Sequence, residues 1–227
     1  MQESPSQPSR LAHAPGEMGA ADLAAHLAAK LCHDLVAPAG ALTMGLELFE
    51  DPDSQDMREE ALALIASNAR KFVALLSFNR VALGASAGAA AFDAAELERL
   101  TRAVFADSPR VELDWAVDAG PLPKPIGRAL LNLAQIGAAV VATGGVVRLS
   151  VEARPGESGA RLIAEGAKPR LRPDTEAGLE GAPLEERFAG HWVQAYYLNR
   201  LVTAEGGRIS TAVEENRVVV RALLPQP

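Results

Sequence analysis

Residues 30–40, KLCHDLVAPAG, place a histidine beside an aspartate in a stretch rich in alanine and leucine. Such a histidine can be a core residue, a metal ligand, an acid–base catalyst or a nucleophile that carries a group covalently. Apolar residues recur around it at steps of three and four, which indicates an amphipathic helix over residues 21–49. At about 100° per residue, His33 lies about 200° from Leu31, opposite the apolar stripe. The periodicity therefore disfavours a core histidine.

The sequence around His33 also disfavours a metal site and a hydrolase. His26 shares its face but lies two turns away, about 10 Å, which is too far for both to bind one ion. The sequence has no Cys/His cluster, and no recognisable arrangement of Ser, His and Asp or of paired carboxylates. A neutral imidazole acting as a nucleophile remains, with Asp34 able to hydrogen-bond the ring and set its tautomer. Pro38 frees the Asp34 carbonyl and bends the helix just past the site.

The helix face around His33 carries mostly small side chains, whereas an ordinary solvated face is dense in lysine and glutamate. This pattern predicts the close approach of another protein. The residues expected to take part in this docking are Ala29, Lys30, Ala37, Gly40 and Met44.

The element that positions His33 is predicted to be a helical hairpin. A second helix fits residues 55–83, with Ile65, Phe72 and Leu76 on one apolar stripe. Two helices of this length, each roughly 40 Å, cannot cover their own apolar stripes. The sequence therefore predicts a homodimer in which two hairpins form a four-helix bundle.

Beyond the hairpin the pattern changes to mixed α/β. We divide the chain into a disordered tail (1–20), the hairpin (21–84), a linker (85–92) and an α/β sandwich (93–227). The sandwich is predicted to contain helices at 93–105, 125–142 and 189–204, strands at 110–117, 146–153, 160–164, 208–213 and 218–223, and a loop at 165–186.

Composition limits the partners and the compartment. A net charge of -7 argues against nucleic acid or an anionic membrane as the main partner. A single cysteine, Cys32, rules out an internal disulfide and suits a reducing cytoplasm. The first 20 residues do not have the pattern of a signal peptide, and the longest uncharged run, 129–147, is interrupted by polar residues and glycines. We therefore expect a cytoplasmic protein.

The His-Asp-Leu motif, with a proline five residues after the histidine, resembles the phosphoacceptor helix of sensor histidine kinases. The closer resemblance is to the ChpT family of histidine phosphotransferases, dimeric intermediates in the alphaproteobacterial cell-cycle phosphorelay. The resemblance covers residues 21–224. It is carried by the sequence CHDLV at 32–36 with Pro38, by the order of the later elements, and by Phe78, Arg80, Val81, Ala82 and Gly84 at the end of the second helix.

The second domain resembles a histidine kinase ATP-binding domain that has lost its chemistry. The sequence LLNL at 130–133 resembles the start of the kinase asparagine box, but the asparagine that would hold Mg²⁺ falls at Ile136. EGAK at 165–168 and HWVQ at 191–194 stand where two glycine motifs should cradle the nucleotide. The resemblance implies that the chain binds no ATP. The domain is then either a relic that keeps only its fold or a reused docking surface.

The resemblance implies a relay in which His33 Nε2 takes a phosphoryl group from the receiver domain of an upstream hybrid kinase. Downstream regulators then take it onto their own receiver aspartates. Asp34 orients or deprotonates His33, and each receiver supplies Mg²⁺, so the chain itself binds no cofactor. Related kinases carry Thr or Asn for a hydrolytic water where this chain has Ala37, which argues against phosphatase activity. The alternatives are a non-catalytic dimeric scaffold that binds receivers, an active histidine kinase core, and an unrelated two-domain protein with a coincidental motif.

Three cationic residues, Lys168, Arg170 and Arg172, lie within five positions of an otherwise acidic chain. They either keep a loop solvated or attract the carboxylates that surround the phosphorylated aspartate of a receiver.

Overall fold

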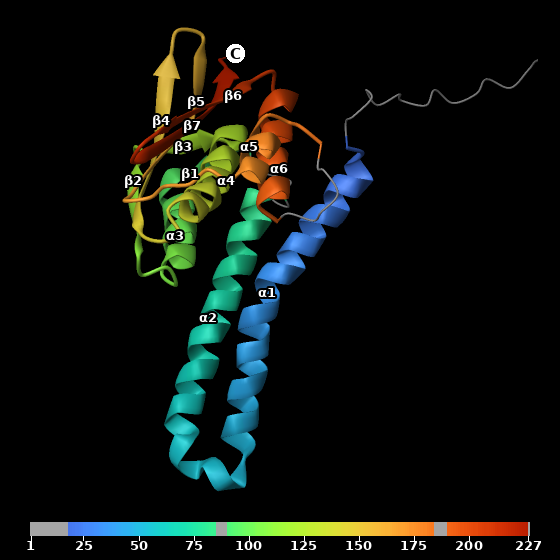
Figure 1. Cartoon of the computed structure of the whole chain (residues 1–227), viewed down its shortest axis with the longest axis vertical. Coiled ribbons are helices and arrows are strands. Elements are labelled where there is room, and N and C mark those ends of the chain that lie inside the picture. Colours follow the sequence, from blue (N-terminus) through green and yellow to red (C-terminus); the bar gives the residue numbers. More distant parts are fainter. Residues whose placement is uncertain (1–17, 85–89, 184–189, 227) are drawn as a thin grey trace, which may run out of the picture.

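The computed structural model describes residues 18–84, 90–183 and 190–226. Figure 1 shows a long helical hairpin that projects from a mixed α/β domain. Helix α1 (Ala20–Glu50) and helix α2 (Arg58–Ala82) are joined by a 3-10 turn, η1 (Pro52–Met57). The predicted helical hairpin is thereby confirmed.

The turn between the helices is fixed by Asp51. Its carboxylate accepts hydrogen bonds from the Ser54 hydroxyl at 2.7 Å and from the Asp53 amide at 3.0 Å. These two bonds favour the ionised carboxylate and hold the pKa of Asp51 below its usual range. The chain can therefore reverse direction within one short turn.

The hairpin helices approach closely where Gly45 of α1 faces Ile65 of α2. A Cβ atom at Gly45 would lie 2.8 Å from Ile65 Cγ1, so a larger residue would displace that side chain. Ile65 therefore packs against α1 within one hairpin and is half-buried there. Three apolar side chains of α2 remain exposed: Leu62, Val73 and Leu76 are 51%, 60% and 40% exposed.

A mixed sheet forms the centre of the second domain. Within the described residues, five strands lie in the order β2-β4-β5-β7-β6, with β2 and β4 parallel and the other neighbours antiparallel. A separate antiparallel pair, β1 and β3, precedes α4. The strand bounds are β1 Ala91–Asp93, β2 Val111–Ala116, β3 Pro121–Pro123, β4 Gly145–Arg154, β5 Glu157–Glu165, β6 Arg208–Glu214 and β7 Arg217–Pro225.

Helices cover one face of this sheet, as Figure 1 shows. They are α3 (Ala94–Phe105), α4 (Lys124–Val140) and α6 (Gly190–Ala204). Leu130 and Leu133 of α4 share one buried cluster with strand side chains such as Leu162. This arrangement confirms a hairpin followed by an α/β sandwich.

Several predicted boundaries were wrong. Residues 165–186 contain helix α5 (Pro173–Leu179), which begins with a proline at the position where a helix tolerates it. The predicted linker 85–92 overlaps β1, and its residues 85–89 lie outside the described residues. The predicted disordered tail, 1–20, extends too far, because the structure describes Met18 and Gly19 and α1 begins at Ala20. Residues 1–17 lie outside the described residues.

The hairpin joins the second domain at the end of α2. Phe78, Val81 and Ala82 belong to the same buried cluster as the core of the second domain. The side-chain amide of Asn132 in α4 also donates a hydrogen bond to the Ala82 carbonyl at 3.1 Å. The last turn of α2 is therefore part of the core of the sandwich.

A second junction lies at the start of α1. The Met18 amide donates to the Tyr196 hydroxyl at 3.3 Å, and Trp192 stacks on Tyr196 with ring centroids 4.7 Å apart. Leu23 and Leu27 of α1 pack against this pair of rings. Figure 1 shows the N-terminal half of α1 leaning away from α2 towards α6. The second domain is thus held against the half of α1 that carries His33.

Candidate functional site

His33 projects from α1 into solvent. Its side chain is 81% exposed, and Nδ1 lies 3.5 Å from Asp34 Oδ1, at the limit of hydrogen-bond distance. An Nδ1–H that faces a carboxylate leaves Nε2 unprotonated and nucleophilic. Pro38 is buried in α1 one turn after Asp34, so the Asp34 carbonyl has no i+4 amide to accept from.

Lys30 completes a short chain of polar groups behind the histidine. Its ammonium lies 2.5 Å from Asp34 Oδ2, so Asp34 faces Lys30 with one oxygen and His33 with the other. The Lys30 side chain is only 17% exposed. We expected Lys30 on the open docking face, but the structure turns it inward to hold Asp34.

The other residues predicted to dock a partner share an open face of α1 with His33. Ala29, Ala37, Gly40 and Met44 are all exposed. A Cβ atom at Gly40 would meet nothing within 4 Å, which leaves the surface beside the histidine unobstructed. This face has the small side chains that close approach of a protein partner requires.

His26 has a different environment. Its ring lies edge-on to Trp192, with centroids 6.2 Å apart, at the junction of α1 with the second domain. It is half-buried, whereas His33 is open. The two histidines that were predicted to share one helix face therefore differ in exposure and in surroundings.

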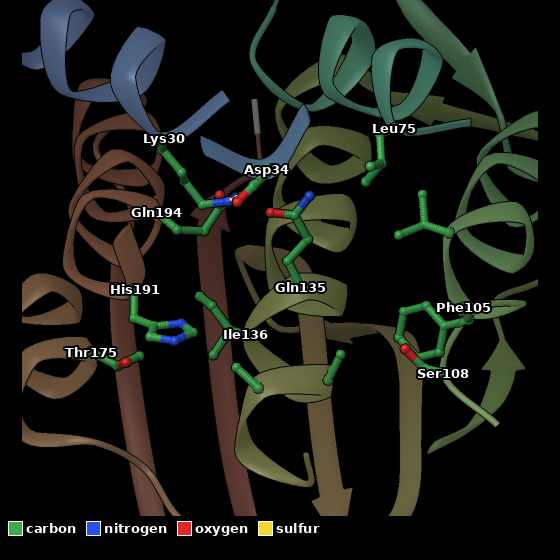
Figure 2. A pocket seen from close by; sticks show the side chains of 13 residues that line it. Lys30, Asp34, Leu75, Phe105, Ser108, Gln135, Ile136, Thr175, His191 and Gln194 are labelled. Atoms are coloured by element: carbon green, nitrogen blue, oxygen red, sulfur yellow. Dashed lines mark hydrogen bonds and ion pairs between the residues drawn. The ribbon is translucent and has the colours of Figure 1, made fainter. Parts of the chain in front are cut away.

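The second domain brings another histidine, His191, to this site. His191 lies in the first turn of α6 and lines a cavity of about 270 Å³ with His33, Asp34 and Lys30. Figure 2 shows a larger cavity beside it, of about 390 Å³, with Lys30 and Asp34 at one end and His191 pointing inward. His191 lies within the predicted helix 189–204, but its position beside His33 could not be predicted from the sequence.

Burial lowers the pKa of His191 below its usual range, and the nearby Arg172 and Lys30 add to this effect. Asp174 and Asp34 act in the opposite direction. A lowered pKa favours the neutral form of the ring.

The residues that the sequence analysis compared with kinase nucleotide motifs have structural roles. Ile136 is buried and lines the larger cavity, where a kinase would need an asparagine. Asn132 is buried and accepts a short hydrogen bond from Gln194. Gly166 donates to the Asn216 carbonyl at 3.2 Å, which ties that segment to the β6–β7 turn.

The basic segment, residues 168–172, lies at the edge of this site. The Arg170 amide donates to the Val140 carbonyl at 2.9 Å, which anchors the segment to the end of α4. Lys168, Arg170 and Arg172 are exposed. Arg172 is close enough to His191 to lower its pKa. Among the described residues, no group of three His, Cys, Asp or Glu side chains is arranged to hold a metal ion.

Comparison with known proteins identifies the family. Residues 94–217 match the family model described as the histidine phosphotransferase C-terminal domain. The chain is 32% identical over 209 residues to protein phosphotransferase ChpT of Brucella abortus (strain 2308), covering 92% of this chain and 98% of that protein.

One solved structure gives the same result, and a second is a more distant match. A structure described as a bacterial phosphotransferase has a TM-score of 0.79 at 31% identity, over 91% of this chain and 98% of that one. The histidine kinase domain of a blue-light activated kinase from Erythrobacter litoralis has a TM-score of 0.45 at 15% identity, over 90% and 93% of the two chains. The chain therefore belongs to the ChpT family of histidine phosphotransferases.

Proposed function

We propose that His33 is the phosphoacceptor and that the protein relays phosphoryl groups between the aspartates of response-regulator receiver domains in the cytoplasm. The observation that carries this proposal is the exposure of His33 beside Asp34 on a face of small side chains. The relationship to ChpT supports a place in a cell-cycle phosphorelay.

The chemistry needs one nucleophile and one positioning carboxylate. His33 Nε2 attacks the phosphorus of a receiver aspartyl phosphate in line; an N–P bond forms, the acyl O–P bond breaks and the receiver carboxylate leaves. The ring keeps its Nδ1 proton and becomes positively charged, and Asp34 stabilises that charge. The reverse steps deliver the group to a second receiver. The receiver supplies Mg²⁺, so this chain contributes the nucleophile and the geometry.

The test follows a labelled phosphoryl group through both halves of the cycle. A receiver domain phosphorylated with ³²P is mixed with the protein, and the purified phosphoprotein is then mixed with a second receiver. Label that moves to the protein and onward supports the relay. Receiver binding without label on the protein would support a non-catalytic scaffold.

We expect the chain neither to bind ATP nor to phosphorylate itself. By the resemblance, Ile136 falls where a kinase carries its Mg²⁺-binding asparagine. The Asn132 side chain is already hydrogen-bonded to Gln194 and to the end of α2. Calorimetry with ATP and Mg²⁺ is expected to show no heat of binding, with an active histidine kinase domain as the positive control. Micromolar affinity would contradict this expectation and favour a kinase core.

We expect the basic segment to speed the encounter with receivers. Arg170→Ala combined with Arg172→Ala should slow transfer about threefold at low salt, because each exposed charge contributes only about 0.2–1 kcal/mol. The difference should shrink as salt is added. The matched control, Arg148→Ala with Arg208→Ala, removes the same charge from the sheet and should transfer at the wild-type rate. Equal rates for both double variants at every salt concentration would mean that the basic segment only keeps the loop solvated and does not attract receivers.

We further propose that two copies pair through their hairpins into a four-helix bundle. The segment Pro52–Ala82 is long and apolar enough, by length and composition, to cross a membrane, yet only 11% of its most apolar window is buried. A membrane span does not fit, because the last turn of this segment is packed in the core of the second domain. A second hairpin would cover the exposed side chains of Leu62, Val73 and Leu76.

A further inference from the structure

The second domain reaches the phosphoacceptor through the first turn of α6. The cavity of about 270 Å³ at this contact is lined by Lys30, His33 and Asp34 from α1 and by Gly190 and His191 from α6. A water molecule occupies roughly 30 Å³ in the liquid, so the cavity has room for a phosphoryl group and several waters. His33 therefore opens onto a hollow that two domains build together.

Besides His33 itself, two of the lining side chains are hydrogen-bond donors. The Lys30 ammonium has three N–H groups, and its bond to Asp34 uses one of them. The His191 imidazole carries an N–H in either tautomer. Gly190 adds no side chain, and a Cβ atom there would be 3.9 Å from Lys30 Cγ, so the first turn of α6 comes close to Lys30.

We propose that Lys30 and His191 hold the phosphoryl group after its transfer to His33 Nε2, by donating hydrogen bonds to its oxygens within the same chain. This inference rests on the proposed role of His33 as the phosphoacceptor. The ligand is a covalently attached phosphoryl group, and the site is complete in one chain without a receiver. The domain that no longer carries nucleotide motifs then serves to retain phosphate between two encounters.

The charges around the cavity suit a group that arrives as a dianion. Before phosphorylation, burial together with Arg172 and Lys30 keeps the pKa of His191 low, against the opposing effect of Asp174 and Asp34. A phosphoryl dianion beside the ring favours the imidazolium and raises this pKa. Hydrogen bonds in which both partners are charged are stronger than neutral ones. Phosphorylation of His33 should therefore strengthen the hydrogen bond from His191 to the phosphoryl group.

The test measures how long phosphohistidine survives. Full-length protein is phosphorylated from a labelled receiver, freed of receiver and Mg²⁺, and followed for loss of label. His191→Phe keeps a ring without a donor, and Lys30→Met removes the ammonium; each is expected to shorten the lifetime about three- to tenfold. His191→Gln retains an N–H donor and is expected to recover most of the lifetime.

A matched control and a second readout separate this role from a structural one. Lys71 on α2 also faces a carboxylate, Asp107 at 3.8 Å, but lies outside the cavity, so Lys71→Met should keep the wild-type lifetime. In wild-type protein, the His191 pKa measured by NMR should rise when His33 is phosphorylated. The same treatment of His33→Gln should leave it unchanged.

Two results would overturn the proposal. Equal lifetimes for wild type, His191→Phe and Lys30→Met, all labelled at His33, would remove the retaining role and leave the relay intact. An unchanged His191 pKa in the phosphorylated wild type would do the same without any substitution. Absence of label from His33 would overturn the relay as well.

Discussion

Replacing His33 with glutamine is expected to abolish phosphoryl transfer to this protein. Glutamine is similar in size and polarity but has no nucleophilic nitrogen, so no N–P bond can form. Because His33 is exposed on α1 and packs against little else, the variant should fold and pair as the wild type does. Labelled transfer from a phosphorylated receiver, measured beside a melting curve, checks both statements.

His26→Gln is the matched control for this experiment. His26 lies on the same helix against Trp192, so its replacement is expected to lower stability slightly while label still appears on the protein. If His33→Gln accepted phosphate and His26→Gln did not, the phosphoacceptor would have been assigned to the wrong histidine.

Leu62→Asp is expected to separate the two copies of the protein. Leu62 is half exposed in the single chain, so the substitution leaves the protomer core untouched. In a two-fold bundle the change occurs twice, and losing the burial of each leucine costs about 1.5–3 kcal/mol. Dimer affinity should therefore fall about a hundredfold or more. Sedimentation equilibrium over a range of concentrations measures the shift.

Val213→Asp is the control for the dimer experiment. Val213 is as exposed as Leu62 but lies on strand β6, away from the hairpin, so this variant should sediment as the wild type does. A folded wild-type monomer at micromolar concentration would contradict the four-helix bundle.

The chemistry of α1 could be predicted from the sequence because one helix carries it. Periodicity alone places His33 opposite the apolar stripe, and adjacency alone places Asp34 beside it. The inward turn of Lys30 could not be predicted in this way, because it depends on α6 packing against α1 at Gly190. The same contact brings His191 to the site. Its position could not be predicted, because His191 is distant in the sequence and lies within an apolar segment.

The secondary-structure elements that were not predicted are short, and their sequence patterns are weak. Strands β1 and β3 have three residues each, and β3 contains two prolines, which normally argue against a strand. Helix α5 has seven residues in a stretch rich in Gly, Pro and charge. Its Gly178 is held close to the Trp192 carbonyl of α6, so the helix is fixed by a partner that lies later in the chain.

Because the last turn of α2 lies in the core of the sandwich, the two parts of this chain form one folding unit. Cutting at the linker would expose Phe78 and leave the Ala82 carbonyl without its Asn132 donor. Losing one buried phenylalanine costs about 1.5–3 kcal/mol, a large share of the ~5–15 kcal/mol that holds a typical domain together. Removing the second domain would therefore destabilise the hairpin itself. Besides any part that it takes in holding phosphate, the second domain is needed for α2, the helix that packs against α1, to fold.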